Sequence, residues 1–238
     1  MQDFNYQLEG QDFKGQVFLP ALNQGDTAPA VLVFHDWGGC NKMAQDYAES
    51  ITDLDMVGIA VDMFGDGRTG HSVEEKMALY GEASQDRARL VRISEAAIVA
   101  AKAHPQVDSK RIVAIGFCFG GLCVLDLARS GADLSGVVSF HGALAPSSDV
   151  VTKDITAPIM ILHGDSDKMV PFSDVSNIRD ELNAAKADWQ MTIYANTHHA
   201  FMNPEANDEE LGTVYNKSVA SKAWESFQLF LRDVFGET

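Results

Sequence analysis

A strand, a tight turn and a helix follow one another between Arg111 and Ala128, and this stretch constrains the fold more than any other. Residues 112–115 (Ile-Val-Ala-Ile) are apolar and mostly β-branched, as is typical of a buried strand. Residues 116–121 (Gly-Phe-Cys-Phe-Gly-Gly) supply the turn, and the chain that follows to Ala128 contains no helix breaker. The sequence therefore predicts a sharp reversal with Cys118 at its tip.

Glycine stands two places before and two places after Cys118. A nucleophile at such a turn has a strained backbone, and side chains at the flanking positions would collide with the neighbouring strand or helix. The turn lifts one side chain clear of the sheet edge, where the N-terminus of a helix favours the thiolate form of a cysteine. A buried packing cysteine is the alternative, but the strand–turn–helix setting favours a nucleophile.

Length and composition set the class of protein. At 238 residues the chain suits a single α/β domain spanning residues 1–238. The net charge of −16 and the pI near 4.6 argue against nucleic acid or an anionic membrane as partner. No apolar run approaches the roughly 20 residues of a membrane span, and residues 1–7 do not resemble a signal peptide. We therefore expect a cytoplasmic protein.

The three cysteines are Cys40, Cys118 and Cys123. They form neither an even disulfide set nor a spaced metal quartet, which suits a reducing compartment. No His/Cys cluster has zinc spacing, and Asp165-Ser166-Asp167 lacks the remaining features of a calcium loop. We expect neither a metal nor a cofactor.

Apolar runs predict strands that alternate with helices. The expected strands cover about residues 4–8, 15–19, 30–34, 57–61, 112–115, 136–140, 158–162 and 190–194. The expected helices cover about residues 43–54, 83–103, 121–128, 174–187 and 219–234. Because parallel neighbours need crossover connections, this alternation predicts an α/β fold with a mainly parallel sheet of about eight strands and helices on both faces. The first two strands would form an antiparallel edge.

A thiol that attacks an ester needs a base and a third group that orients the base. The acid would come from the loop at residues 163–171, in which both Asp165 and Asp167 are eligible. The base would come from residues 196–201, where His198 and His199 are adjacent. The residue types alone do not separate the members of either pair.

An oxyanion hole completes such a centre. It uses the backbone N–H of the residue after the nucleophile and another from the loop that follows the third strand. These groups would be the N–H groups of Phe119 and Trp37.

The three segments 116–121, 164–167 and 199–201 together resemble the dienelactone hydrolase (carboxymethylenebutenolidase) family of the α/β-hydrolase superfamily. The resemblance extends over nearly the whole chain. It implies Cys118 as the nucleophile, Asp167 as the orienting acid and His199 as the base. It also implies the α/β-hydrolase fold.

Two positions depart from the family pattern. An acidic residue after the third strand approaches the resting thiol in this family, and the matching residue is Asp36, one methylene shorter than the usual glutamate. The arginine expected four residues after the histidine, which holds a substrate carboxylate, is replaced by Asn203. Arg87 or Arg68 would have to supply the positive charge instead. Bidentate carboxylate recognition is thereby weakened, which favours a neutral ester or a different lactone as substrate.

The function expected from the sequence is hydrolysis of a small carboxylic ester or lactone through an acyl-thioester on Cys118. The chain would act as a monomer or homodimer. The alternative is a protein of the same fold that binds a ligand without turnover, or one that senses oxidants through Cys118.

Overall fold

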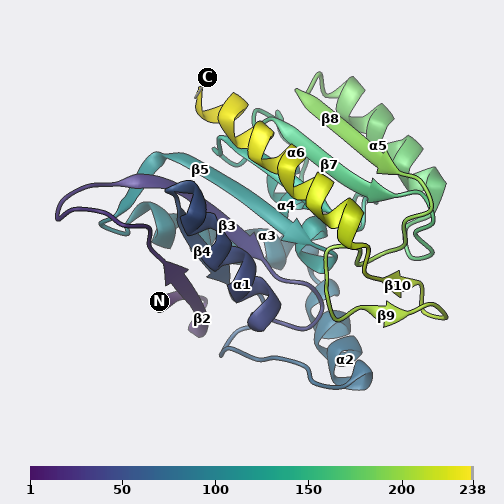
Figure 1. Cartoon of the computed structure of the whole chain (residues 1–238), viewed down its shortest axis with the longest axis horizontal. Helices are drawn as coiled ribbons and strands as arrows, with labels where there is room; N and C mark the ends of the chain where they lie inside the picture. Colours follow the sequence, from purple (N-terminus) through teal and green to yellow (C-terminus); the bar gives the residue numbers. More distant parts are fainter. Residues whose placement is uncertain (237–238) are drawn as a thin grey trace.

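The computed structural model describes residues 1–236, so the last two residues of the predicted domain lie outside the described range. Eight strands form one sheet in the order β1-β2-β4-β3-β5-β6-β7-β8 (Figure 1). They are β1 (Gln2–Leu8), β2 (Gln11–Phe18), β3 (Ala28–Phe34), β4 (Val57–Val61), β5 (Val107–Phe117), β6 (Gly136–Phe140), β7 (Ile159–Gly164) and β8 (Trp189–Tyr194). The helices are α1 (Lys42–Ser50), 3₁₀ helix η1 (Ile51–Leu54), α2 (Val73–Ser84), α3 (Arg87–Lys102), α4 (Phe119–Arg129), α5 (Phe172–Ala184) and α6 (Lys217–Phe235).

Strand directions divide the sheet into two parts. β1 pairs with β2 and β2 with β4 in antiparallel fashion, whereas every pairing from β4 through to β8 is parallel. The predicted eight-stranded, mainly parallel sheet with an antiparallel first hairpin is therefore confirmed. Its parallel strands end at one common edge, where the loops after β3, β5, β6, β7 and β8 meet.

Both faces of the sheet are covered by helices, which explains why the central strands lack polar residues. In β3, Leu32 and Phe34 belong to one core cluster, while Val31 and Val33 belong to the other. The first core includes buried residues of α3, α4 and α5, and the second includes residues of α1 and α6. In Figure 1, α1 and α6 lie in front of the sheet, with α3 and α4 behind it. A strand covered on both sides must be apolar at every position.

Two elements were not predicted. The predicted helix at residues 83–103 is too long at its start, because Ala83 and Ser84 belong to a separate helix, α2. None of the twelve residues of α2 is buried, so it carries little of the hydrophobic periodicity by which helices are found. The available signal was the capping box formed by Ser72 and Glu75. The second missed element is a small hairpin of β9 (Asn207–Asp208) and β10 (Thr213–Val214).

Candidate active site

Cys118 occupies the predicted turn between β5 and α4. Its backbone dihedrals are φ 54° and ψ −109°, which a residue with a side chain rarely adopts. A Cβ at Gly116 would collide with the backbone of Gly120, and one at Gly120 would collide with the carbonyl of Phe34. The Cys118 N–H donates to the carbonyl of Phe140 at 3.1 Å, and its thiol is half-buried at the head of α4. The close approach of neighbouring chain segments thus requires both glycines.

Asp167 and His199 meet from two different loops. Oδ2 of Asp167 lies 2.7 Å from Nδ1 of His199, and both side chains are buried. The other carboxylate oxygen accepts hydrogen bonds from the N–H groups of Met169 and Val170 at 2.8 and 3.1 Å. The bond to Nδ1 leaves Nε2 as the free end of the ring, so the carboxylate sets both the orientation and the tautomer of the imidazole.

The β9–β10 hairpin holds the backbone of His199. The His199 N–H donates to the carbonyl of Gly212 at 3.1 Å, and its carbonyl accepts from Val214 N–H at 3.0 Å. The acid and base loops are also joined, because Ser166 N–H donates to the carbonyl of Thr197 at 3.0 Å. Local backbone bonds therefore place the imidazole, beyond its contact with the carboxylate.

Electrostatics favour a protonated His199. Burial alone would lower the pKa of His199, but the charge of Cys118 and the hydrogen bond to Asp167 outweigh it and raise the pKa to about 10. For Asp167, burial is opposed by the hydrogen bond and positive charge of His199, and its pKa is lowered. Nε2 of His199 is buried and has no hydrogen bond of good geometry within residues 1–236. The sulfur thus acts on the ring through charge in this resting arrangement, and an acid proton is available beside it.

The structure separates the two pairs that the residue types left open. Asp165 is exposed, and its N–H donates to the carbonyl of Tyr194 at 2.9 Å, whereas Asp167 is buried against the imidazole. His198 lies outside this arrangement, and His199 is the histidine that Asp167 contacts.

The loop after β3 carries Asp36 and Trp37 to the same edge of the sheet. Asp36 is buried, and its Oδ1 accepts from Gly38 N–H at 2.8 Å. Burial raises the pKa of Asp36, against the opposing effects of the Gly38 N–H and the charges of His35, Lys76 and His199. The carboxyl group therefore lies within the electrostatic field of the centre while it closes its own loop.

The two predicted oxyanion donors lie at the ends of structural elements. Phe119 is the first residue of α4, where helix N–H groups have no partner within the helix. Trp37 follows Asp36 in the loop after β3, which His35 braces. Nε2 of His35 accepts from Met63 N–H at 3.1 Å, so its Nδ1 carries the proton and donates to the Asp36 carbonyl at 2.5 Å.

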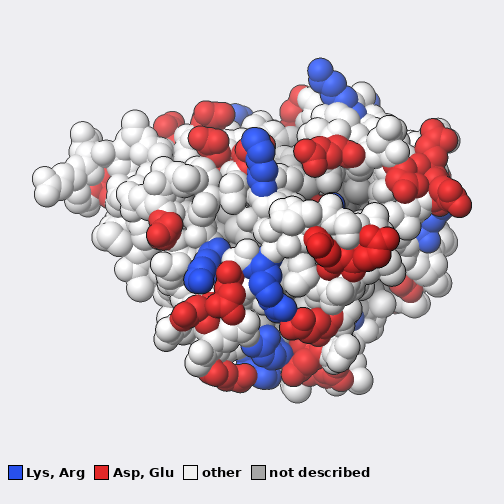
Figure 2. Space-filling model, turned by 90° about the horizontal axis from the view of Figure 1, so that it is seen from below, with Lys and Arg blue, Asp and Glu red and all other residues white. Residues whose placement is uncertain are grey.

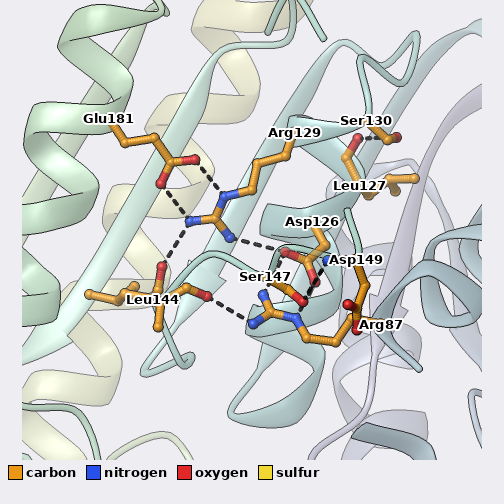
Figure 3. Close-up of polar contacts among 10 residues, drawn as sticks. Arg87, Asp126, Leu127, Arg129, Ser130, Leu144, Ser147, Asp149 and Glu181 are labelled. Atoms are coloured by element: carbon orange, nitrogen blue, oxygen red, sulfur yellow. Dashed lines mark hydrogen bonds and ion pairs between the residues drawn. The ribbon is translucent and has the colours of Figure 1, made fainter. Parts of the chain in front are cut away.

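Arg87 belongs to a buried ion network. Its guanidinium makes two 2.6 Å bonds to the carboxylate of Asp126 and one 2.9 Å bond to the carbonyl of Ala145. Arg129 lies between Asp126 and Glu181 (Figure 3). The charge of Arg87 is thus neutralised by a fully buried partner.

The other predicted substrate-binding positions are also engaged. Oδ1 of Asn203 accepts from Glu205 N–H at 2.9 Å within its own turn. Arg68 pairs with Glu82 through two bonds of 2.9 and 3.0 Å. Neither side chain is oriented by a contact to Cys118 or His199 among the interactions of the described residues.

Three residues near the centre were missed by sequence reasoning. Tyr80 on α2 meets the ring of Phe119 edge-on at 5.8 Å, and burial and the charge of Cys118 raise its pKa. Lys76 on the same helix places its amine 5.9 Å from the ring centre of Trp37. His141, which follows β6, packs against His199. Tyr80 and Lys76 escaped notice because α2 was not predicted.

The described residues 1–236 contain no group of three or more His, Cys, Asp or Glu side chains that could hold a metal ion. Within the same range, no helix has both the length and the apolar character required to cross a membrane.

Comparisons with known proteins agree with this architecture. The model of the dienelactone hydrolase family matches residues 13–235. A protein of Aquifex aeolicus with the name "Putative carboxymethylenebutenolidase" is 25% identical, and the match covers 94% of each chain. The solved structure of m3DLH has 31% identity and a TM-score of 0.91, with coverage of 98% of this chain and 97% of the other. A dienelactone hydrolase-like promiscuous phosphotriesterase, P91, from metagenomic libraries has 28% identity, a TM-score of 0.87 and the same coverage. The fold is therefore that of the α/β-hydrolases.

Proposed function

Because this chain belongs to the dienelactone hydrolase family, we propose that it hydrolyses a carboxylic ester or lactone through a thioester on Cys118. The contact of Asp167 with His199, beside a half-buried thiol at the head of a helix, is the observation that carries the proposal. Three elements distant in sequence supply these residues, as a nucleophile, base and orienting acid require.

Acylation begins from a thiolate and a protonated imidazole. With the pKa of His199 raised to about 10, the ring holds its proton at neutral pH, and the negative charge remains on sulfur. The thiolate attacks the carbonyl carbon, and the N–H groups of Phe119 and Trp37 stabilise the oxyanion. When the intermediate collapses, Nε2 of His199 protonates the departing alkoxide. In a lactone this alkoxide stays attached as a hydroxyl group.

Deacylation uses the same groups in the reverse roles. Neutral His199 removes a proton from a water molecule, and the resulting hydroxide attacks the thioester carbonyl. The carbon–sulfur bond breaks, the carboxylic acid leaves, and the thiolate–imidazolium pair is restored. Asp167 holds the ring through Nδ1 throughout, so the proton is always exchanged at Nε2.

Replacement of Cys118 tests the proposal. The wild-type protein should release nitrophenol from p-nitrophenyl acetate, and Cys118→Ala should reduce kcat/KM at least about 1,000-fold. Intact-mass spectrometry of the wild type quenched in acid should detect one acetyl adduct, which the alanine variant should lack. Undiminished hydrolysis by Cys118→Ala would refute the thioester.

Two rival functions use the same experiment. A ligand-binding protein on this fold would release one equivalent of nitrophenol and then stop, because its thioester would not be hydrolysed. An oxidant sensor would gain a stable sulfenic acid on Cys118 at low peroxide concentration without sustained ester turnover. Continuous release of product over many equivalents excludes both alternatives.

The similarity to a promiscuous phosphotriesterase motivates one additional substrate. A neutral phosphotriester presents a phosphoryl oxygen that the N–H groups of Phe119 and Trp37 could bind as they bind an oxyanion. An aryl dialkyl phosphate should therefore be assayed beside the esters. Its turnover by the wild type and loss in Cys118→Ala would assign this second activity to the same nucleophile.

A further inference from the structure

Helix α2 is unusual because its apolar residues are not covered. Leu79 and Ala83 pack against the core, yet they are only partly buried. Val73, Met77 and Tyr80 are 49%, 61% and 37% exposed. Exposed side chains at i, i+4 and i+7 lie on one side of a helix, so these three form a continuous stripe.

Two residues show where this stripe faces. Tyr80 contacts the ring of Phe119 at 5.8 Å, and the charge of Cys118 contributes to its raised pKa. Lys76, one turn before Tyr80, lies over the ring of Trp37. Because Val73 and Met77 share this side of α2, they border the entrance to the nucleophile.

The stripe lies on the acyl side of the sulfur. His199 protonates the departing oxygen, so the alcohol part of an ester must lie toward the imidazole, and the acyl part must extend away from it. Tyr80 interacts with Cys118 and Phe119, on the side of the nucleophile helix. An acyl chain that leaves the reaction centre in this direction would meet the side chains of α2.

The charges around α2 disfavour a negatively charged acyl group. The basic residues Arg68 and Arg87 are paired with Glu82 and Asp126, and Lys76 interacts with an aromatic ring. The first turn of α2 is acidic, with Glu74 and Glu75. Figure 2, which views the molecule from the side of α2, shows acidic side chains distributed over this face. A carboxylate in this position would lack a free cationic partner and would be repelled.

We infer that the exposed stripe of α2, formed by Val73, Met77 and Tyr80, binds the acyl group of the substrate, and that this group is apolar and uncharged. The inference rests on the proposed function and specifies its substrate class. Esters or lactones with an aliphatic acyl part of several carbons would cover the stripe and remove its apolar surface from water.

Three substrates with one leaving group test this inference. They are p-nitrophenyl acetate, p-nitrophenyl hexanoate and the p-nitrophenyl monoester of adipic acid, which has a chain of the same length ending in a carboxylate. For the wild type, kcat/KM should be about tenfold higher for the hexanoate than for the acetate. The adipate monoester should fall at or below the acetate.

Substitutions on α2 identify the surface responsible. Val73→Ser and Met77→Ser should each lower the hexanoate-to-acetate ratio of kcat/KM about threefold or more. Val99→Ser is the matched control, because Val99 is an exposed valine (68%) on a different helix, α3. Its ratio should equal that of the wild type.

The outcomes separate this inference from the proposed function. Preference for the adipate monoester, or an unchanged ratio in both α2 variants, would overturn the inference while leaving the thioester mechanism intact. If none of the three esters is turned over faster by the wild type than by Cys118→Ala, the proposed function fails, and the inference fails with it.

Discussion

The imidazole ring of His141 lies edge-on to that of His199, with ring centroids 5.1 Å apart and an interplanar angle of 65°. Both nitrogens of His141 are buried and have no hydrogen-bond partner among residues 1–236. Burial lowers the pKa of His141 well below its ordinary value, and the charge of His199 lowers it further. The ring is therefore neutral at physiological pH and supports the base by contact alone.

Replacing His141 should reveal this packing role. In His141→Phe the ring contact is kept and two unpartnered nitrogens are removed, so the free energy of unfolding should stay within about 1 kcal/mol of the wild type or increase. In His141→Ala a cavity forms beside His199, and the loss should be about 3 kcal/mol. Urea unfolding measures both. A loss of more than about 2 kcal/mol in the phenylalanine variant would mean that the nitrogens have partners.

Asp167 should be far more important for catalysis than its neighbour Asp165. Asp167→Asn preserves the shape but can no longer hold His199 as a proton donor toward it, so kcat for p-nitrophenyl acetate should fall about 10³- to 10⁴-fold. Asp165→Asn is the matched control, because Asp165 is exposed two residues away. It should change kcat less than about twofold. Equal losses in the two variants would contradict the assigned contact.

The proton on His199 should depend on Cys118. Among the influences that raise the pKa of His199 to about 10, the charge of Cys118 is the largest and Asp167 comes next. Cys118→Ala removes this negative charge, while burial continues to favour the neutral ring, so the midpoint should move to lower pH. NMR of ¹⁵N-labelled histidine follows the titration directly. A midpoint that stays near 10 in Cys118→Ala would show that the thiolate does not stabilise the imidazolium.

The buried ion network should matter for stability. Asp126 is fully buried and accepts bonds from both Arg87 and Arg129 (Figure 3). Asp126→Asn leaves two buried guanidinium groups poorly compensated and should cost about 3–5 kcal/mol of unfolding free energy. Glu181→Gln affects the more exposed end of the network and should cost about 1 kcal/mol. Equal costs would mean that Asp126 is not the centre of the network.

Arg87 provides a separate check on substrate charge. Since its guanidinium is held by Asp126 and the carbonyl of Ala145, Arg87→Gln should lower stability without changing the ratio of kcat/KM between the hexanoate and the adipate monoester. A selective loss of activity toward the adipate monoester in this variant would assign substrate carboxylate binding to Arg87.

The sheet could be predicted because its central strands are apolar at every position. Residues 57–61 and 136–140 were predicted with the observed bounds. Helix ends were less accurate, since they depend on caps. The helix predicted at residues 174–187, for example, begins at Phe172 and ends at Ala184. Such differences do not move any residue between the two faces of the sheet.

The candidate site was predictable where a residue type has few alternatives and not where contact decides. Cys118 stands out between two glycines that the turn requires. The choice between Asp165 and Asp167 depends on which carboxyl group is buried against the base, which no local pattern encodes. Likewise, His141 acts through a contact between loops after different strands, and its neighbours in sequence do not reveal it.

Helix α2 also bears on how this protein can change over generations. Since none of its twelve residues is buried, substitutions there should each alter folding free energy by only about 0.5 kcal/mol or less. The entrance can therefore vary freely while the glycine-bounded turn and the two partner loops remain fixed. A lineage could acquire new substrates through α2 alone, without first gaining spare stability to tolerate the mutations.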